Sequence, residues 1–114
     1  MRLLLDEAVP RGLRRSLPDH EVRTVGEMGW SGGENGVPLA FAANQFEAFI
    51  TDDKNLSHQQ NLASLPLAVI FLEARSIEWS ELIALVPALD RALICLVPRS
   101  FIRVFGSGRS ADLA

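Results

Sequence analysis

Two pairs of carboxylic acids, each directly after a short apolar run, are the residues best suited to chemistry in this sequence. Asp6 and Glu7 follow residues 3–5, and Asp52 and Asp53 follow residues 48–51. If the two runs are neighbouring parallel strands, Asp6 and Asp53 converge at one end of the sheet. Carboxylates held a few ångströms apart repel each other unless a cation lies between them, and Mg²⁺ or Mn²⁺ prefers such oxygen ligands. The pattern predicts a divalent-cation site that activates water for phosphodiester hydrolysis.

Further polar residues lie close to these acids in the chain. Asn55, two residues after Asp53, could supply a neutral oxygen or orient a metal-bound water. Glu7 and Asp52 could point into solvent, because neighbours along a strand face opposite ways. The alternative interpretation is that all these acids are solvated loop residues or helix caps. Three basic residues could hold substrate phosphates, or form a solvated helix face: Arg11, Arg14 and Arg15.

Alternating strands and helices must position these side chains. Apolar or alternating runs predict strands at residues 3–5, 21–25, 48–51, 67–72, 92–97 and 101–104. Amphipathic spacing predicts helices at about 10–17, 38–46 and 78–92. Strands that are apolar throughout favour a parallel sheet covered on both faces, and hence an α/β fold. Such folds place function at the carboxyl ends of their strands, where the acids lie.

The last predicted helix, residues 78–92, contains a proline. Pro87 should kink it, because proline lacks the N–H that an inner helical turn requires. We expect the thiol of Cys95 to be buried in the apolar run that follows. One face of the helix should pack into the core through Trp79, Leu82, Ile83, Val86 and Leu89.

Composition limits the remaining possibilities. A chain of 114 residues with 48% hydrophobic residues fits one domain, which we place at residues 1–105, before a flexible tail at 106–114. The single cysteine excludes an internal disulfide and a multi-cysteine zinc site. The formal net charge of −3 argues against non-specific attraction to nucleic-acid phosphates. No run of about 18 apolar residues predicts a membrane span, so we expect a cytoplasmic protein.

The order and spacing of several segments across residues 1–104 resemble the small bacterial PIN-like proteins. These are predicted ribonucleases that are often encoded in toxin–antitoxin pairs. The matching segments are Met1–Glu7 with Pro10-Arg11, then Gly29–Gly32, Asn35-Gly36, Thr51–Leu56, Gln59–Leu62 and Ala74–Ser76.

The resemblance implies a three-layer α/β/α sandwich with a mostly parallel central sheet, and Mg²⁺- or Mn²⁺-dependent cleavage of RNA by clustered acids. Asp6 takes the place of the first acid and Asp53 that of the acid after the later strand. Asn55 stands where many relatives have a further aspartate. Val37 occupies the position of an expected acid, and Glu34 is the nearest carboxylate. The implied partners are an RNA substrate, an antitoxin protein and a second copy of the chain.

Two other functions remain open at this point. A PIN-like domain with too few metal ligands would act as a binding module for a protein or RNA. A phosphorylation receiver would also place acids after the first strand and near position 53. It needs a lysine, commonly just before a proline, at the end of the last strand. Here Val97 precedes Pro98, and Lys54 is the only lysine.

Overall fold

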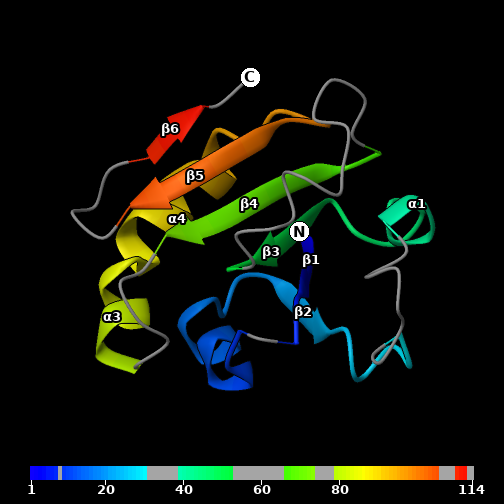
Figure 1. Ribbon diagram of the computed structural model, residues 1–114, viewed down its shortest axis with the longest axis horizontal. Coiled ribbons are helices and arrows are strands. Elements are labelled where there is room, and N and C mark those ends of the chain that lie inside the picture. Colours follow the sequence, from blue (N-terminus) through cyan, green and yellow to red (C-terminus); the bar gives the residue numbers. More distant parts are fainter. Residues whose placement is uncertain (8, 31–38, 53–65, 74–78, 106–109, 113–114) are drawn as a thin grey trace.

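Six strands, three α-helices and one 3₁₀ helix make up the described part of the chain. The computed structural model describes residues 1–7, 9–30, 39–52, 66–73, 79–105 and 110–112 (Figure 1). The elements are, in chain order, β1 (Arg2–Leu5), the 3₁₀ helix η1 (Arg11–Ser16), β2 (Glu21–Thr24), α1 (Leu39–Ala42), β3 (Ala48–Thr51), β4 (Ala68–Glu73), α3 (Trp79–Ala84), α4 (Val86–Ile94), β5 (Phe101–Phe105) and β6 (Ser110–Asp112).

The strands form one sheet in the order β2-β1-β3-β4-β5-β6. The first five are parallel to their neighbours, and β6 runs antiparallel to β5. The expectation of an α/β fold with a mostly parallel sheet is therefore confirmed. The strands predicted at 3–5, 21–25, 48–51, 67–72 and 101–104 are all present, with no end shifted by more than one residue.

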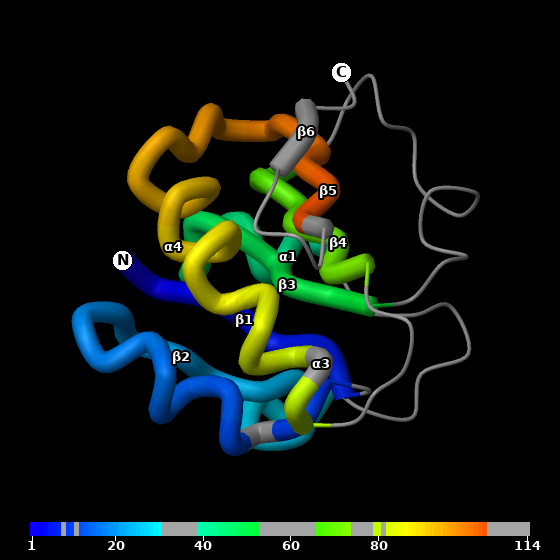
Figure 2. Tube along the Cα trace, turned by 90° about the vertical axis from the view of Figure 1, so that its left-hand side faces the viewer, coloured from blue at the N-terminus to red at the C-terminus, as the bar shows by residue number. Residues whose placement is uncertain are grey.

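Both faces of the sheet are buried, which explains why the central strands are apolar without alternation. In β1, Leu3 and Leu5 join the core cluster that includes η1, α3 and α4. Leu4, between them, joins a second cluster with Leu39 and Ala42 of α1. In Figure 2, the chain of α3 and α4 lies on this face of the sheet, and α3 reaches η1, which it contacts. Leu3 and Leu5 therefore pack on one face of the sheet, and Leu4 packs on the other.

Two connections of the sheet have opposite hands. From β1 the chain passes through η1 to β2 on one side, and from β4 through α3 and α4 to β5 on the other. Both connections pack on the same face of the sheet. About 98% of parallel crossovers are right-handed. Two right-handed crossovers that lead in opposite directions along a sheet lie on opposite faces. Because these two connections lie on the same face, one of them has the rarer left hand. The arrangement brings α3 against η1.

The predicted helix at 78–92 was wrong in its boundaries, and the strand predicted at 92–97 is not formed. The helix is divided at Leu85 into α3 and α4, and Pro87 lies in the first turn of α4. Proline is well tolerated there, because the first helical N–H groups have no intrahelical partner. Helix α4 therefore runs on to Ile94 and includes the first three residues of the expected strand, and residues 95–97 follow as turn and irregular chain.

This division also changes which side chains are buried. Leu82, Leu85 and Leu89 are buried, whereas Trp79 at the start of α3 is 47% exposed and Ile83 is 37% exposed, contrary to expectation. Cys95 caps the carboxyl end of α4 and is exposed, so the prediction of a buried thiol was also wrong.

The carboxyl-terminal segment adds the last strand. Residues 110–112, within the stretch expected to be a tail, form β6 and pair with residues 102–104 of β5. Helix α4, with nine residues, is the longest of the helices in the described ranges. None of these helices has the length and apolar character of a membrane span.

Leu89→Ala tests the placement of α4. Leu89 is fully buried, so we expect the substitution to lower the free energy of unfolding by about 2–5 kcal/mol, through lost burial and a residual cavity. Ile94→Ala is the matched control, because Ile94 is 82% exposed on the same helix, and should change stability by less than about 0.5 kcal/mol. Urea denaturation measures both. Equal effects would contradict the observed register of α4.

Candidate active site

The carboxyl ends of β1 and β3 lie side by side at the switch point of the sheet, where the strand order reverses. β1 pairs with β2 on one side and with β3 on the other, so successive connections lead away from this point in opposite directions. In open α/β sheets, ligands bind in the crevice at such a switch point. Asp6 follows β1 directly, and its N–H donates to the carbonyl of Ile50 in β3, 2.9 Å away.

The Asp6 carboxylate is held by two hydrogen bonds. The hydroxyl of Thr51, the last residue of β3, donates to Oδ2 over 2.7 Å, and the N–H of Glu7 donates to Oδ1 over 2.8 Å. Thr51 is fully buried, so its hydroxyl is fixed by the sheet. Each carboxylate oxygen has two acceptor positions, so both keep one for a ligand. The two strands thus orient a carboxylate at the switch point.

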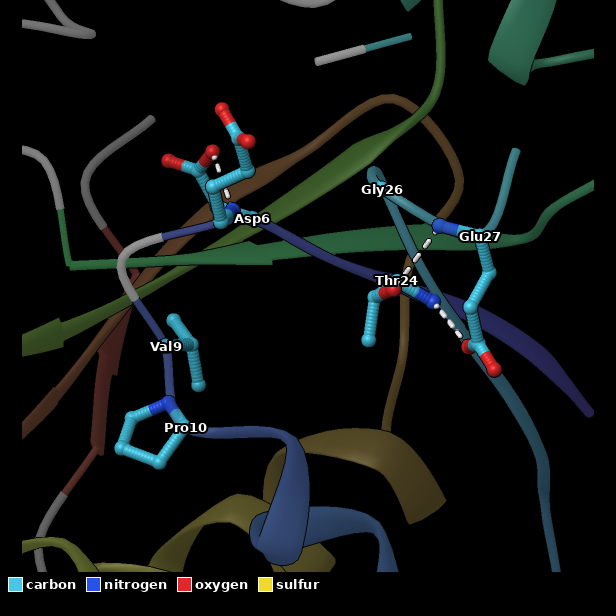
Figure 3. A pocket seen from close by; sticks show the side chains of 7 residues that line it. Asp6, Val9, Pro10, Thr24, Gly26 and Glu27 are labelled. Carbon is cyan, nitrogen blue, oxygen red and sulfur yellow. Dashed lines mark hydrogen bonds between the residues drawn. The ribbon is translucent and has the colours of Figure 1, made fainter. Parts of the chain in front are cut away.

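A cleft of about 530 Å³ opens beside Asp6, between the ends of β1 and β2 (Figure 3). This volume lies in the range of small-ligand sites. Three of the described lining residues are acidic and none of them is basic, a composition suited to a cation. The lining consists of Asp6, Glu7, Val9, Pro10, Thr24, Gly26 and Glu27.

Glu27, on the β2 side of the cleft, is bonded to neighbouring protein groups. Its carboxylate accepts from the backbone N–H of Thr24 over 2.9 Å, and its own N–H donates to the Thr24 hydroxyl over 3.1 Å. Arg14 of η1 donates to both carboxylate oxygens, at 3.0 and 3.1 Å. Figure 3 shows the Glu27 carboxylate turned away from Asp6. The negative charge facing the cleft therefore comes mainly from Asp6 and Glu7.

These contacts shift the ionisation of Glu27. The hydrogen bond from the Thr24 backbone, followed by that from Arg14, lowers the pKa of Glu27 below its ordinary value of 4.5. Both contacts favour the charged form. Glu27 is therefore ionised at neutral pH and ties η1 to the end of β2.

The structure places only some of the predicted site residues. Asp6 lies at the switch point as expected, Glu7 is exposed, and Asp52 is half-buried at the end of β3. Arg14 pairs with Glu27, and Arg15 is exposed on η1. Four positions lie outside the described residues, namely Glu34, Val37, Asp53 and Asn55, as does the side chain of Arg11.

The described part of the site fits a hard divalent cation in the chemistry of its donors. Asp6 presents an oriented carboxylate, and ligating carboxylates in metal sites are usually themselves hydrogen-bonded, as Asp6 is by Thr51. Within residues 1–7, 9–30, 39–52 and the later described ranges, no three acidic, histidine or cysteine side chains form a metal-holding group. A complete ligand set would therefore require acids from outside these ranges.

Sequence reasoning missed three residues that shape the site. Thr24 and Glu27 match the T-x-x-E capping-box pattern, in which side chain and backbone groups satisfy each other, so this pair could have been found. Thr51 carried no comparable signal, because its contact with Asp6 depends on the register of β1 and β3.

No protein-family model, curated protein or solved structure matches this chain. Its strand order and its cleft define it as an α/β protein with a polar cleft at the carboxyl end of a mostly parallel sheet.

Glu27→Gln should lower stability at neutral pH. The lowered pKa means that ionised Glu27 stabilises the folded state above pH 4.5, and that this contribution disappears as the pH falls through the folded-state pKa. The difference in melting temperature between wild type and variant should therefore shrink towards about pH 3. Thermal melts across this range measure it. A difference in melting temperature of the same size at neutral pH and at about pH 3 would contradict the contacts assigned to Glu27.

Proposed function

We propose that the protein is a Mg²⁺- or Mn²⁺-dependent endoribonuclease of PIN-like type, with a three-layer α/β/α fold. The observation that carries the proposal is the Asp6 carboxylate, which Thr51 orients at the strand switch point, in a residue that lines the cleft. Asp53 follows Thr51 by two residues, so covalent geometry keeps their Cα atoms within about 7 Å. Asp53 is therefore the natural second ligand.

Each residue has a definite role in this proposal. Asp6 and Asp53 bind the cation, Thr51 orients Asp6, and Asn55 and Glu34 complete the set of polar ligands. When bound, the cation supplies Lewis-acid chemistry, which activates water and stabilises charge on the phosphodiester. Arg15, exposed on η1, and Arg11 hold substrate phosphates. Arg14 serves the structure instead, because Glu27 occupies its guanidinium.

The receiver hypothesis fits the structure less well. The parallel strands do follow the order 2-1-3-4-5 that doubly wound receivers also use. In a sheet with only right-handed crossovers, however, the β4–β5 connection would lie on the face opposite η1, and here it lies on the same face. The sequence also provides no lysine near the end of β5.

The remaining parts of the proposal concern partners. By resemblance, the protein is the toxin component of a toxin–antitoxin pair, acts in the cytoplasm and forms a homodimer. The partner that the resemblance implies is an antitoxin, usually a small DNA-binding protein.

Asp6→Asn and Asp53→Asn should each abolish most RNA cleavage. Either change removes a charged metal ligand, and even groups that only support ligands are worth about 10- to 100-fold. We expect a rate loss of more than about 100-fold in a Mn²⁺ assay on structured RNA. Asp19→Asn, an identical change at an exposed turn away from the cleft, is the control.

Two outcomes of this assay would contradict the proposal. Unchanged cleavage by Asp53→Asn would remove Asp53 from the catalytic set. Absence of cleavage by the wild type with either metal would favour the alternative of a binding module.

Added Mn²⁺ should raise the melting temperature of the wild type, because a ligand of the native state stabilises it by mass action. The effect should need high metal concentrations, since few carboxylates hold such ions weakly without substrate phosphates. It should be lost in Asp6→Asn and retained in Asp19→Asn. An equal shift in all three proteins would indicate binding elsewhere.

A further inference from the structure

The half-exposed indole of Trp79, at the start of α3, lies against η1, the short helix that follows Pro10 of the cleft wall. Trp79 begins α3 and packs against Gly12 of η1, where an added Cβ would lie 3.4 Å from Cη2 and 3.5 Å from Cζ3 of the ring. Pro10, two residues before Gly12, lines the cleft. Two residues span at most about 7 Å, so the contact of the indole with η1 lies next to the cleft wall.

Contact with η1 leaves much of this ring in solvent. About half of Trp79 is exposed, although burying a tryptophan contributes strongly to stability. Gly12 allows the edge of the ring, Cη2 and Cζ3, to approach the η1 backbone without a side chain between them. Contact through the edge positions the indole against η1, and about half of the residue stays accessible to a partner.

Charge and shape together favour a nucleic-acid base as that partner. Arg15 is exposed on η1, the helix that Trp79 contacts. Basic groups that follow the backbone, combined with aromatic rings on which bases stack, characterise proteins that bind single strands. A protein with net charge −3 gains little from non-specific attraction, so stacking would contribute a larger share of the affinity.

We propose that Trp79 is a stacking platform for one unpaired base of the RNA strand whose phosphate enters the cleft. The inference rests on the proposed function, since it takes RNA as the substrate. It adds a defined subsite: a base on Trp79, beside η1, adjacent to the scissile phosphate at Asp6. The subsite accepts any base, because every base has a flat face.

An abasic scan tests this subsite. A short single-stranded RNA and versions lacking one base at successive positions are bound to wild type and Trp79→Ala, with Ca²⁺ in place of Mn²⁺. For the wild type, one abasic position should weaken binding about tenfold. For Trp79→Ala, that position should have no effect, because the two changes remove the same contact. Trp79→Phe should restore part of the difference.

Two variants control for general effects of apolar surface. Ile83→Ala changes another exposed residue of α3, and Phe41→Ala removes an aromatic side chain, 67% exposed, on α1 at the opposite face. Both should show the wild-type abasic profile. Loss of folding in Trp79→Ala would appear as a lower melting temperature, and in that case Trp79→Phe decides the result.

The outcomes separate this inference from the proposed nuclease function. Position-specific coupling to Trp79 without Mn²⁺-dependent cleavage would support the subsite and overturn the nuclease. Cleavage with the same abasic profile in wild type and Trp79→Ala would overturn the subsite alone. Absence of any RNA binding would also overturn the subsite.

Discussion

The parallel pairing of β1 with β3 is the constraint on which the site depends. It brings the end of β3 beside the end of β1, so that the buried hydroxyl of Thr51 reaches the carboxylate of Asp6. A slip of one residue in this register would turn the apolar side chains of β1 to the wrong faces. The packing of both faces therefore also fixes the position of the Asp6 carboxylate.

The cleft has two walls with different electrostatic roles. On the β2 side, Glu27 is satisfied by Thr24 and Arg14, and it fastens η1 to the sheet. On the β1 side, Asp6 accepts its hydrogen bonds from two uncharged donors, the Thr51 hydroxyl and the Glu7 N–H. A group whose charge is already compensated serves stability, whereas an oriented carboxylate open to a cleft is available to bind a ligand. Asp6 is therefore the proposed metal ligand, whereas Glu27 has a structural role.

Sequence patterns predicted the sheet better than the last two helices. The apolar runs located five strands, because both faces of the sheet are covered and the signal is continuous. The extent of α4 was missed because an apolar run such as residues 92–97 suits a buried strand and a helix equally. In the structure, Pro87 lies in the first turn of a new helix that starts at Val86, which the sequence alone did not indicate. The exposure of Trp79 follows from the same division, which leaves Leu82 and Leu85 as the inward positions.

The candidate site was predicted in part. The position of Asp6 at a strand end could be read from the residue types, and the α/β order implied that such ends gather on one edge. The hydrogen bond from Thr51 and the pairing of Glu27 with Arg14 depend on strand register and on the unusual placement of α3 and η1. Neither follows from local sequence preference.

Paramagnetic broadening by Mn²⁺ in amide NMR spectra tests the central claim most directly. If Asp6 binds the cation at the switch point, the signals of Asp6, Glu7 and Thr51 should broaden at the lowest Mn²⁺ concentrations. Those of Val97 and Arg99, in the turn before β5, should persist. Early broadening spread over exposed acids such as Glu21 and Asp19, with Asp6 unaffected, would contradict the account.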